Sequence, residues 1–390
     1  MPQELAYVII TPYSLFKSRT GGILSRLITR TGLDLVAVRM FAPSQELVKQ
    51  YSEAIISAND PQDRRVQELI YNYILQNLSP DPKTGQRRRV MMLIFRGEDA
   101  VRKTRSVVGN ISHDRRGGET IRDTYGDLIT DENGQVRYFE PAVLAPPTKD
   151  ECEAKLKLWA RYSEADGGVL ENVMNYPAGE KPQRTLVLIK PENFRFPSGR
   201  PGNVIDFFSR TGLFIVAIKL HRMSVAQALE FYGPVREVLR TKLKDTVGSK
   251  ARTAVEKEFG FKINVETEKQ LGDILGASFG DHQFDNIVRF MSGHAPSDIP
   301  EADWTKPGTE RCIALVYEGI EAVRKIRDVL GPTDPSKAPP GSIRREFGQT
   351  IMVNAAHASD SEDNARREMG IVNVGENIFK KVVEEFYGKL

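Results

Sequence analysis

The histidine with the most informative surroundings is His357, which lies within residues 354–361, NAAHASDS. A neutral imidazole is a competent nucleophile when one ring nitrogen faces the substrate and a hydrogen bond holds the other. Residues 359–361, SDS, are typical of a helix N-terminus. Such a helix would carry Glu368 about two turns further on, where its carboxylate could hold the imidazole. The pattern predicts a catalytic histidine with its orienting carboxylate, although on local composition alone a structural histidine remains the alternative.

The elements that must position this histidine occur twice in the chain. The first matching pair shares RTGL followed by VAV or VAI, and the second reads GEDAVRKTRSVVG and GIEAVRKIRDVLG. The matching blocks are residues 22–44 with 202–224, residues 97–109 with 319–331, and residues 121–126 with 343–348. Three blocks in the same order indicate two homologous domains.

The two domains have the same predicted order of elements. We expect the first domain at residues 1–173 and the second at residues 184–390, joined by a linker that combines Pro, Gly and charge. Each copy reads as strand, helix ending at Thr-Gly, strand, strand, helix and a last segment. This βαββαβ order predicts an α+β chain of two tandem ferredoxin-like domains. Residues 240–283, mostly charged with spaced apolar positions, predict a helical insertion in the second domain.

From Thr185 to its end the chain resembles the nucleoside diphosphate kinase family. The likeness rests on Ile189-Lys190-Pro191 at a strand end, on residues 342–347, SIRREF, and on the motif around His357. The resemblance implies transfer of the γ-phosphate of an NTP to an NDP by a ping-pong mechanism, with His357 as the nucleophile. It also makes Glu368 the hydrogen-bond partner of the other ring nitrogen.

The resemblance further implies which residues bind the nucleotide. Lys190, Arg327, Thr333 and Arg344 would hold the phosphates, Asn354 would bind the sugar hydroxyl region, and Tyr232 would lie near the nucleophile. Fixed cations suit phosphoryl transfer, which needs mainly positioning and electrostatic stabilisation. Mg²⁺ would bridge the phosphates, so we expect no protein metal ligands. Taken singly, a Lys or Arg of this kind is usually a solvated surface charge, and a Tyr is more often a packing residue than a catalytic one.

The chain departs from the family pattern at three places. Ala358 replaces the Gly after the histidine, Val353 replaces the Arg before the Asn, and the insertion interrupts a helix that carries a further phosphate-binding Arg. Arg240 or another insertion residue would have to supply that charge. These departures leave a rival function, a non-catalytic nucleotide-binding sensor or scaffold. Retention of His357 together with Glu368 argues against it.

The first copy has lost the nucleophile. Thr11 occupies the position of Lys190, and Ile111 occupies that of Thr333. Residues 140–144, EPAVL, replace the segment that ends at the histidine, whereas Arg105 and Arg122 are retained. The only histidine of this copy, His113, reads as a surface residue. We expect that this domain does not catalyse phosphoryl transfer. We expect it instead to supply the partner surface of an intramolecular pseudo-dimer. Because the family forms dimers and larger rings, we expect a homo-oligomer, with a trimer of pseudo-dimers as the ring.

The composition of the chain argues against several other classes of protein. The 390 residues carry a net charge of +3, too small to steer the molecule to nucleic acid or anionic lipid, so the basic run at residues 86–89, QRRR, reads as a solvated loop. Two cysteines, Cys152 and Cys312, exclude a disulfide framework, and no Cys/His cluster has zinc-ligand spacing. Apolar runs are far shorter than the ~20 residues of a membrane span, and no export signal is evident. We therefore expect a cytoplasmic protein without membrane partners.

Overall fold

The computed structural model describes residues 2–58, 60–111 and 117–390, so His113 lies outside the described residues. The chain divides into two compact units. One comprises the residues up to Leu220 together with Ile313–Leu390, and the other is His221–Cys312. In the described part of the chain, no helix is both long and apolar enough to cross a membrane.

The larger unit contains two four-stranded sheets with the same topology. The first has the order β2-β3-β1-β6, built from β1 (Gln3–Ile10), β2 (Asp34–Phe41), β3 (Val90–Glu98) and β6 (Val143–Leu144). The second has the order β10-β7-β9-β8, built from β7 (Gln183–Ile189), β8 (Phe214–His221), β9 (Cys312–Gly319) and β10 (Ala356–Ala358). In each sheet the first and third strands are central and the last strand lies at an edge. This is the ferredoxin-like order, so the predicted fold class is confirmed.

The repeated sequence blocks form equivalent helices. The first crossover helices are α2 (Thr20–Thr31) and α8 (Arg200–Phe208), and the second are α5 (Ala100–Val108) and α12 (Ala322–Leu330). Gly32 and Gly212, which follow α2 and the 3₁₀ turn after α8, have φ of 63° and 68°. This left-handed conformation suits glycine, which explains why both copies stop at Thr-Gly.

The remaining elements of this unit surround the sheets. They are the helices α1 (Pro12–Phe16), α3 (Gln45–Glu53), α4 (Arg64–Asn77), α6 (Ile121–Tyr125), α7 (Lys149–Tyr162), α13 (Ile343–Phe347), α14 (Glu362–Val372) and α15 (Ile378–Tyr387), and the hairpin of β4 (Asp127–Thr130) and β5 (Val136–Glu140). The C-terminal helix α15 packs against β2 and α7 of the first copy. Phe379 of α15 meets the ring of Phe41 at 5.3 Å, and Trp159 of α7 meets the same ring at 5.0 Å. The second copy thus completes the core of the first.

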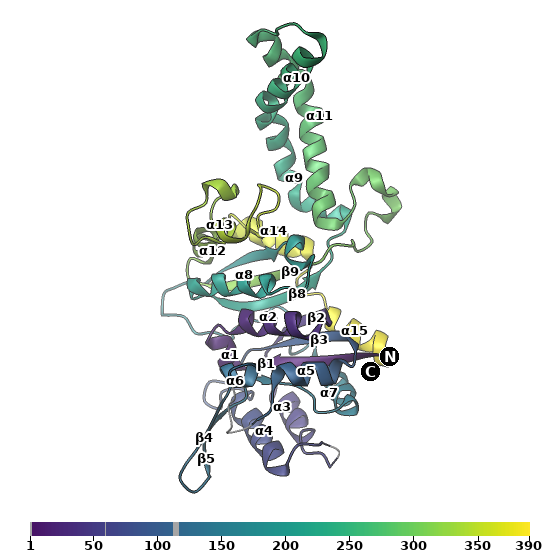
Figure 1. The fold of residues 1–390 in the computed structure, drawn as a ribbon. Coiled ribbons are helices and arrows are strands. Elements are labelled where there is room, and N and C mark those ends of the chain that lie inside the picture. Colours follow the sequence, from purple (N-terminus) through teal and green to yellow (C-terminus); the bar gives the residue numbers. More distant parts are fainter. Residues whose placement is uncertain (1, 59, 112–116) are drawn as a thin grey trace. The chain divides into compact units, whose positions relative to one another are not determined.

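Helices α2 and α8 bring the two copies into direct contact, side by side in Figure 1. A Cβ atom on Gly202 would lie 2.1 Å from the carbonyl oxygen of Gly21, so only glycine permits this approach. Asp206 on α8 accepts hydrogen bonds from the backbone N–H groups of Gly21 and Gly22, at the N-terminus of α2. The helix dipole and these hydrogen bonds favour the carboxylate, but burial outweighs them and raises the pKa of Asp206.

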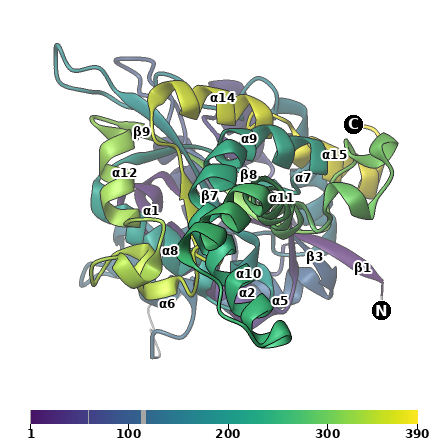
Figure 2. The same cartoon turned by 90° about the horizontal axis from the view of Figure 1, so that it is seen from above.

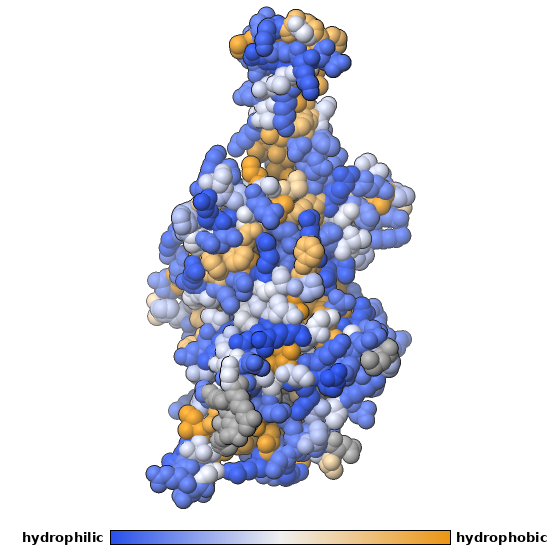
Figure 3. All heavy atoms as spheres, in the orientation of Figure 1, coloured by the Kyte–Doolittle hydropathy of each residue, from blue (hydrophilic) through white to orange (hydrophobic). Residues whose placement is uncertain are grey.

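The smaller unit, His221–Cys312, is a helical hairpin that contains the predicted insertion at residues 240–283. Helices α9 (Val225–Lys242) and α10 (Lys244–Phe259) both pack against α11 (Val265–Ser292), and Figure 2 shows the three in end-on view. Gly272 and Gly280 of α11 face the backbone of these helices, because a Cβ on either would lie 2.6 Å from the Lys244 carbonyl or the Arg240 Cα. The exposed Phe259, Phe261 and Val265 lie at the end of the hairpin, where Figure 3 shows apolar colouring.

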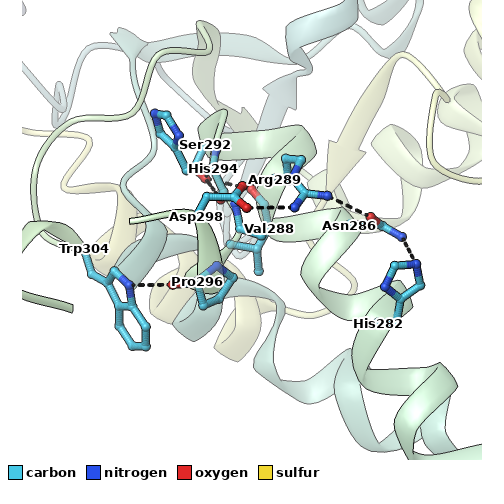
Figure 4. A network of polar contacts seen from close by, with 10 residues as sticks. His282, Asn286, Val288, Arg289, Ser292, His294, Pro296, Asp298 and Trp304 are labelled. Carbon is cyan, nitrogen blue, oxygen red and sulfur yellow. Dashed lines mark hydrogen bonds and ion pairs between the residues drawn. The ribbon is translucent and has the colours of Figure 1, made fainter. Parts of the chain in front are cut away.

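A polar network holds the chain that leaves α11. Arg289 of α11 forms a double ion pair with Asp298 at 3.0 Å, and the Trp304 indole donates to the Pro296 carbonyl (Figure 4). The Ser292 hydroxyl donates to the Val288 carbonyl at 2.8 Å. These contacts fix the return segment on the end of the helix.

Candidate active site

The backbone around His357 is held in an unusual conformation. His357 is the middle residue of β10 and pairs with Leu188 of β7. Two positions earlier, Ala355 has a φ of 72°, which costs energy for a residue with a side chain. Glu192 accepts from the Ala355 N–H at 2.8 Å, and the Asn193 side chain donates to the Ala355 carbonyl at 2.8 Å. The PEN sequence after Lys190 therefore maintains the bend that leads into β10.

The imidazole of His357 is held by a buried carboxylate. Its Nε2 lies 2.9 Å from Oε2 of Glu368, and the same oxygen accepts a hydrogen bond from the Ser359 hydroxyl at 2.6 Å. The Glu368 side chain is 6% exposed, against 23% for the histidine. Ser361 caps α14 by accepting from the Asn364 N–H at 3.1 Å, which sets the register that brings Glu368 to the ring. A carboxylate on Nε2 favours the tautomer with a proton there, which directs the lone pair of Nδ1 toward chemistry.

Lys190 lies deep beside this histidine strand. Its ammonium group donates to the Met352 carbonyl and to Oδ1 of Asn354, the latter at 3.0 Å. Burial lowers the pKa of Lys190 to about 8, with a further lowering by the positive charge of Arg344 and a counteracting effect of Glu192. The ammonium is therefore a poorly solvated cation, which binds a phosphate more strongly than a surface lysine does.

The predicted phosphate-binding residues of this unit lie in one connected group. Arg344 donates to the carbonyls of Gly331 and Ala356 at 3.0 and 3.2 Å. The Asn354 side chain donates to the Thr333 carbonyl at 3.1 Å. Arg327, in the last turn of α12, is close enough to Asp360 to help lower the pKa of that carboxyl, after the larger effect of its hydrogen bond from Asn364.

Two predicted residues belong to the hairpin unit and are described with it. Tyr232 lies on α9, where its ring is 4.9 Å from that of Phe231. Its role near the nucleophile stays a prediction. Arg240 makes two hydrogen bonds to Asp281 at 2.7 Å and one to Glu237 at 2.8 Å, so its guanidinium is engaged within the hairpin.

Sequence reasoning missed three residues that shape the site. Glu192, Asn193 and Ser359 hold the backbone and the carboxylate, yet none was predicted. The adjacency of Glu192 and Asn193 to the Lys190-Pro191 strand end was an available signal. Ser359 was noticed only as part of a helix N-terminus, whereas its hydroxyl is buried against Glu368.

The strand register identifies the corresponding positions of the first copy. Leu144 of β6 pairs with Ile9 of β1, as His357 pairs with Leu188. Ala142 has a φ of 61°, matching Ala355. Leu144 thus occupies the place of the nucleophile, and by the same spacing Lys155 occupies that of Glu368. Lys155 is buried and forms an ion pair with Glu151 at 2.7 Å.

A carboxylate occupies the first copy where the second has its buried ammonium. Glu140 accepts from the Thr11 hydroxyl at 3.0 Å, the Tyr73 hydroxyl at 2.7 Å and the Ala142 N–H at 2.9 Å. Burial raises the pKa of Glu140. The cavity beside Arg122 and Glu140 measures about 20 Å³, which has room for about one water molecule and is too small for a phosphate group. This arrangement does not suit a phosphate.

The features of the second copy define a class: a ferredoxin-like enzyme that presents a carboxylate-held histidine among fixed cations. The nucleoside diphosphate kinase family matches residues 4–135 and 254–378. The chain belongs to the nucleoside diphosphate kinase family, whose members are phosphotransferases, in a tandem form.

Relatives of single-copy length support this assignment. The nucleoside diphosphate kinase of Campylobacter hominis is 30% identical over 196 residues, which cover 50% of this chain and 98% of that relative. That of Wolinella succinogenes is 31% identical over 197 residues, covering 50% and 98%. The solved Aquifex aeolicus nucleoside diphosphate kinase is 26% identical, covers 49% of this chain and 95% of its own, and has a TM-score of 0.32. At that TM-score the fold assignment rests on the strand order instead.

Proposed function

We propose that this chain is a nucleoside diphosphate kinase that moves the γ-phosphoryl group of an NTP to an NDP through a phosphorylated His357. The observation that carries the proposal is the buried Glu368, which accepts from both His357 and Ser359. A purely structural histidine has no need of a buried carboxylate whose second donor is a buried hydroxyl.

The reaction runs in two half-reactions that share one histidine. The Nδ1 lone pair attacks the γ-phosphorus while the bond from that phosphorus to the bridging oxygen breaks, so NDP leaves with the electron pair. A second NDP then attacks the phosphohistidine with a terminal oxygen of its β-phosphate and restores the imidazole. Glu368 stabilises the positive charge that the ring gains in each transition state, because its carboxylate accepts a hydrogen bond from the Nε2–H group.

Lys190, Arg344 and Arg327 supply positive charge to the phosphates, which Thr333 also binds, and Asn354 binds the sugar hydroxyl region. We retain Tyr232 as a residue near the nucleophile on the strength of the family resemblance. The described residues contain no cluster of three metal-ligating side chains. We propose that the phosphates themselves carry a Mg²⁺ ion, which would neutralise part of their charge.

We propose that the first copy, residues 1–173, is inert and completes the catalytic copy, residues 184–390, as an intramolecular pseudo-dimer. The glycine contact between α2 and α8 and the packing of α15 on the first sheet support this pairing. Three such chains would form the ring of six domains. Cys152 and Cys312 are both buried and are not joined in a disulfide, which accords with a reducing cytoplasm.

The arginines of the basic run at residues 86–89 have contacts within the fold. Arg87 of the basic run pairs with Asp166 at 2.9 Å and donates to the Ala42 carbonyl. Arg89 is buried and donates to the Ile215 carbonyl. Two of the three arginines therefore serve the fold, and the prediction that this run is a solvated loop is wrong for Arg89.

The test is incubation of the full chain with Mg²⁺ and γ-labelled ATP, followed by GDP. We expect acid-labile label on the protein that is chased into GTP. His357→Ala should take up no label, and Glu368→Gln should be labelled at least about tenfold more slowly. His282→Ala is the matched control, since His282 is exposed on the hairpin and contacts only Asn286 among the hydrogen-bond partners seen. If the wild-type protein binds ATP but takes up no label, the kinase proposal is wrong and the nucleotide-sensor alternative takes its place.

A further inference from the structure

A second cavity lies where the two copies meet, away from His357. It has a volume of about 270 Å³. Apolar walls come from both copies: Leu15 and Phe16 of α1, Ile205 of α8, and Leu213 with Phe214 at the start of β8. Strand β8 is the edge of the second sheet opposite β10, so this cavity and the histidine lie at different edges.

A buried cation faces these apolar walls. Arg89 lines the cavity and is 8% exposed. Its guanidinium lies over the Phe214 ring at 5.2 Å and donates from Nη1 to the Ile215 carbonyl at 2.5 Å. Burial lowers the pKa of Arg89 to about 10, which leaves it charged at neutral pH. Among the described residues this is its one hydrogen bond, although a guanidinium has five N–H donors.

A tyrosine with an unsatisfied hydroxyl lines the same cavity. Tyr317 of β9 is 2% exposed, and its hydroxyl has no hydrogen-bond partner in the described part of the structure. A buried hydroxyl without a partner costs free energy that a ligand can recover. Arg89 and Tyr317 thus add two polar groups with unused hydrogen-bonding capacity to a mainly apolar cavity, which Ser18, Thr20 and Ser209 also line. A few polar groups in a mainly apolar wall are the usual composition of a small-molecule site between domains.

We propose that this cavity binds a small monocarboxylate with an apolar or aromatic body. Arg89 pairs with the carboxylate of the ligand, and Tyr317 hydrogen-bonds the same carboxylate. The apolar body of the ligand lies among Leu15, Phe16 and Leu213. A cavity of ~150 Å³ holds a benzene ring, so this one accommodates a ring with a short acidic side chain. Such a ligand contacts both copies at once and therefore stabilises their association by mass action. The site is independent of the proposed kinase chemistry.

The probe is 3-phenylpropanoate, compared with the uncharged 3-phenylpropanamide, titrated calorimetrically into the full chain with saturating ADP and Mg²⁺ to fill the nucleotide site. We expect the acid to bind about tenfold or more tightly than the amide, because only the acid forms the charge-assisted pair with Arg89. Arg89→Gln should abolish that difference, and His357→Ala should leave it unchanged.

Phe16→Ala gives a test that does not depend on Arg89→Gln folding. Phe16 is 67% exposed at the rim, so its truncation should weaken both probes without unfolding the chain. The matched control is Phe259→Ala, which removes a ring that is 71% exposed on the hairpin and should have no effect. Equal binding of acid and amide to the wild type, binding of neither at millimolar concentration, or equal effects of the two Phe variants would overturn the proposal.

Discussion

The depressed pKa of Lys190 makes nucleotide affinity fall steeply with pH just above neutrality. Only the protonated ammonium attracts phosphate, and burial places its pKa at about 8 in the free protein. The charged fraction then drops from about three quarters at pH 7.5 to about one tenth at pH 9. The Kd for ADP should rise about eightfold over this interval, equivalent to about 1.3 kcal/mol. A solvated lysine would give no change, because it titrates well above pH 9.

The assay is calorimetric titration of ADP with Mg²⁺ at four values between pH 7.5 and 9, where the phosphates of ADP keep their charge. Lys190→Gln should bind more weakly at pH 7.5 and show a flat profile. Lys337→Gln, which removes an exposed lysine, should keep the wild-type slope. A wild-type Kd that stays constant from pH 7.5 to 9, or a slope that survives in Lys190→Gln, would refute the assignment of Lys190 as a buried phosphate-binding cation.

Two further predictions concern the contact between the copies. Burial raises the pKa of Asp206 to about 6 from its ordinary 3.8, so its ionised form destabilises the fold at pH 8 and this penalty disappears as the pH falls toward 4. Asp206→Asn should therefore be about 1–2 kcal/mol more stable than the wild type in urea unfolding at pH 8, after allowance for partial exposure, and equal to it near pH 4; a variant less stable at pH 8 would contradict this. Gly202→Ala should lose about 2–4 kcal/mol, since its Cβ would lie 2.1 Å from the Gly21 carbonyl. The control Gly370→Ala on α14, where a Cβ meets nothing within 4 Å, should be neutral or stabilising, and equal unfolding midpoints for the two Ala variants would count against tight packing of α2 on α8.

The repeat made most of the architecture predictable, because each copied block encodes one element of a βαββαβ unit. The helix signal at residues 359–361 likewise located α14 and hence the carboxylate of Glu368. The contacts that link distant segments could not be foreseen in the same way. No local pattern shows that Glu192 and Asn193 hold Ala355, or that Glu140 meets Thr11, because these pairs depend on strand register. The sequence also gave no sign that Arg89 of a basic run is buried, since its partner is a backbone carbonyl of the other copy.

The packing of α15 on the first sheet has a consequence for the order in which the chain folds during synthesis. Phe41 and Trp159 are made before the second copy, but Phe379, the ring that covers Phe41, is made 220 residues after Trp159. At ~5–20 residues per second, the interval between α7 and α15 lasts about ten to forty seconds. Throughout that time the nascent first copy carries an uncovered aromatic surface on the ribosome. The first copy is thus translated before the second, yet it completes its core only after α15 has been made.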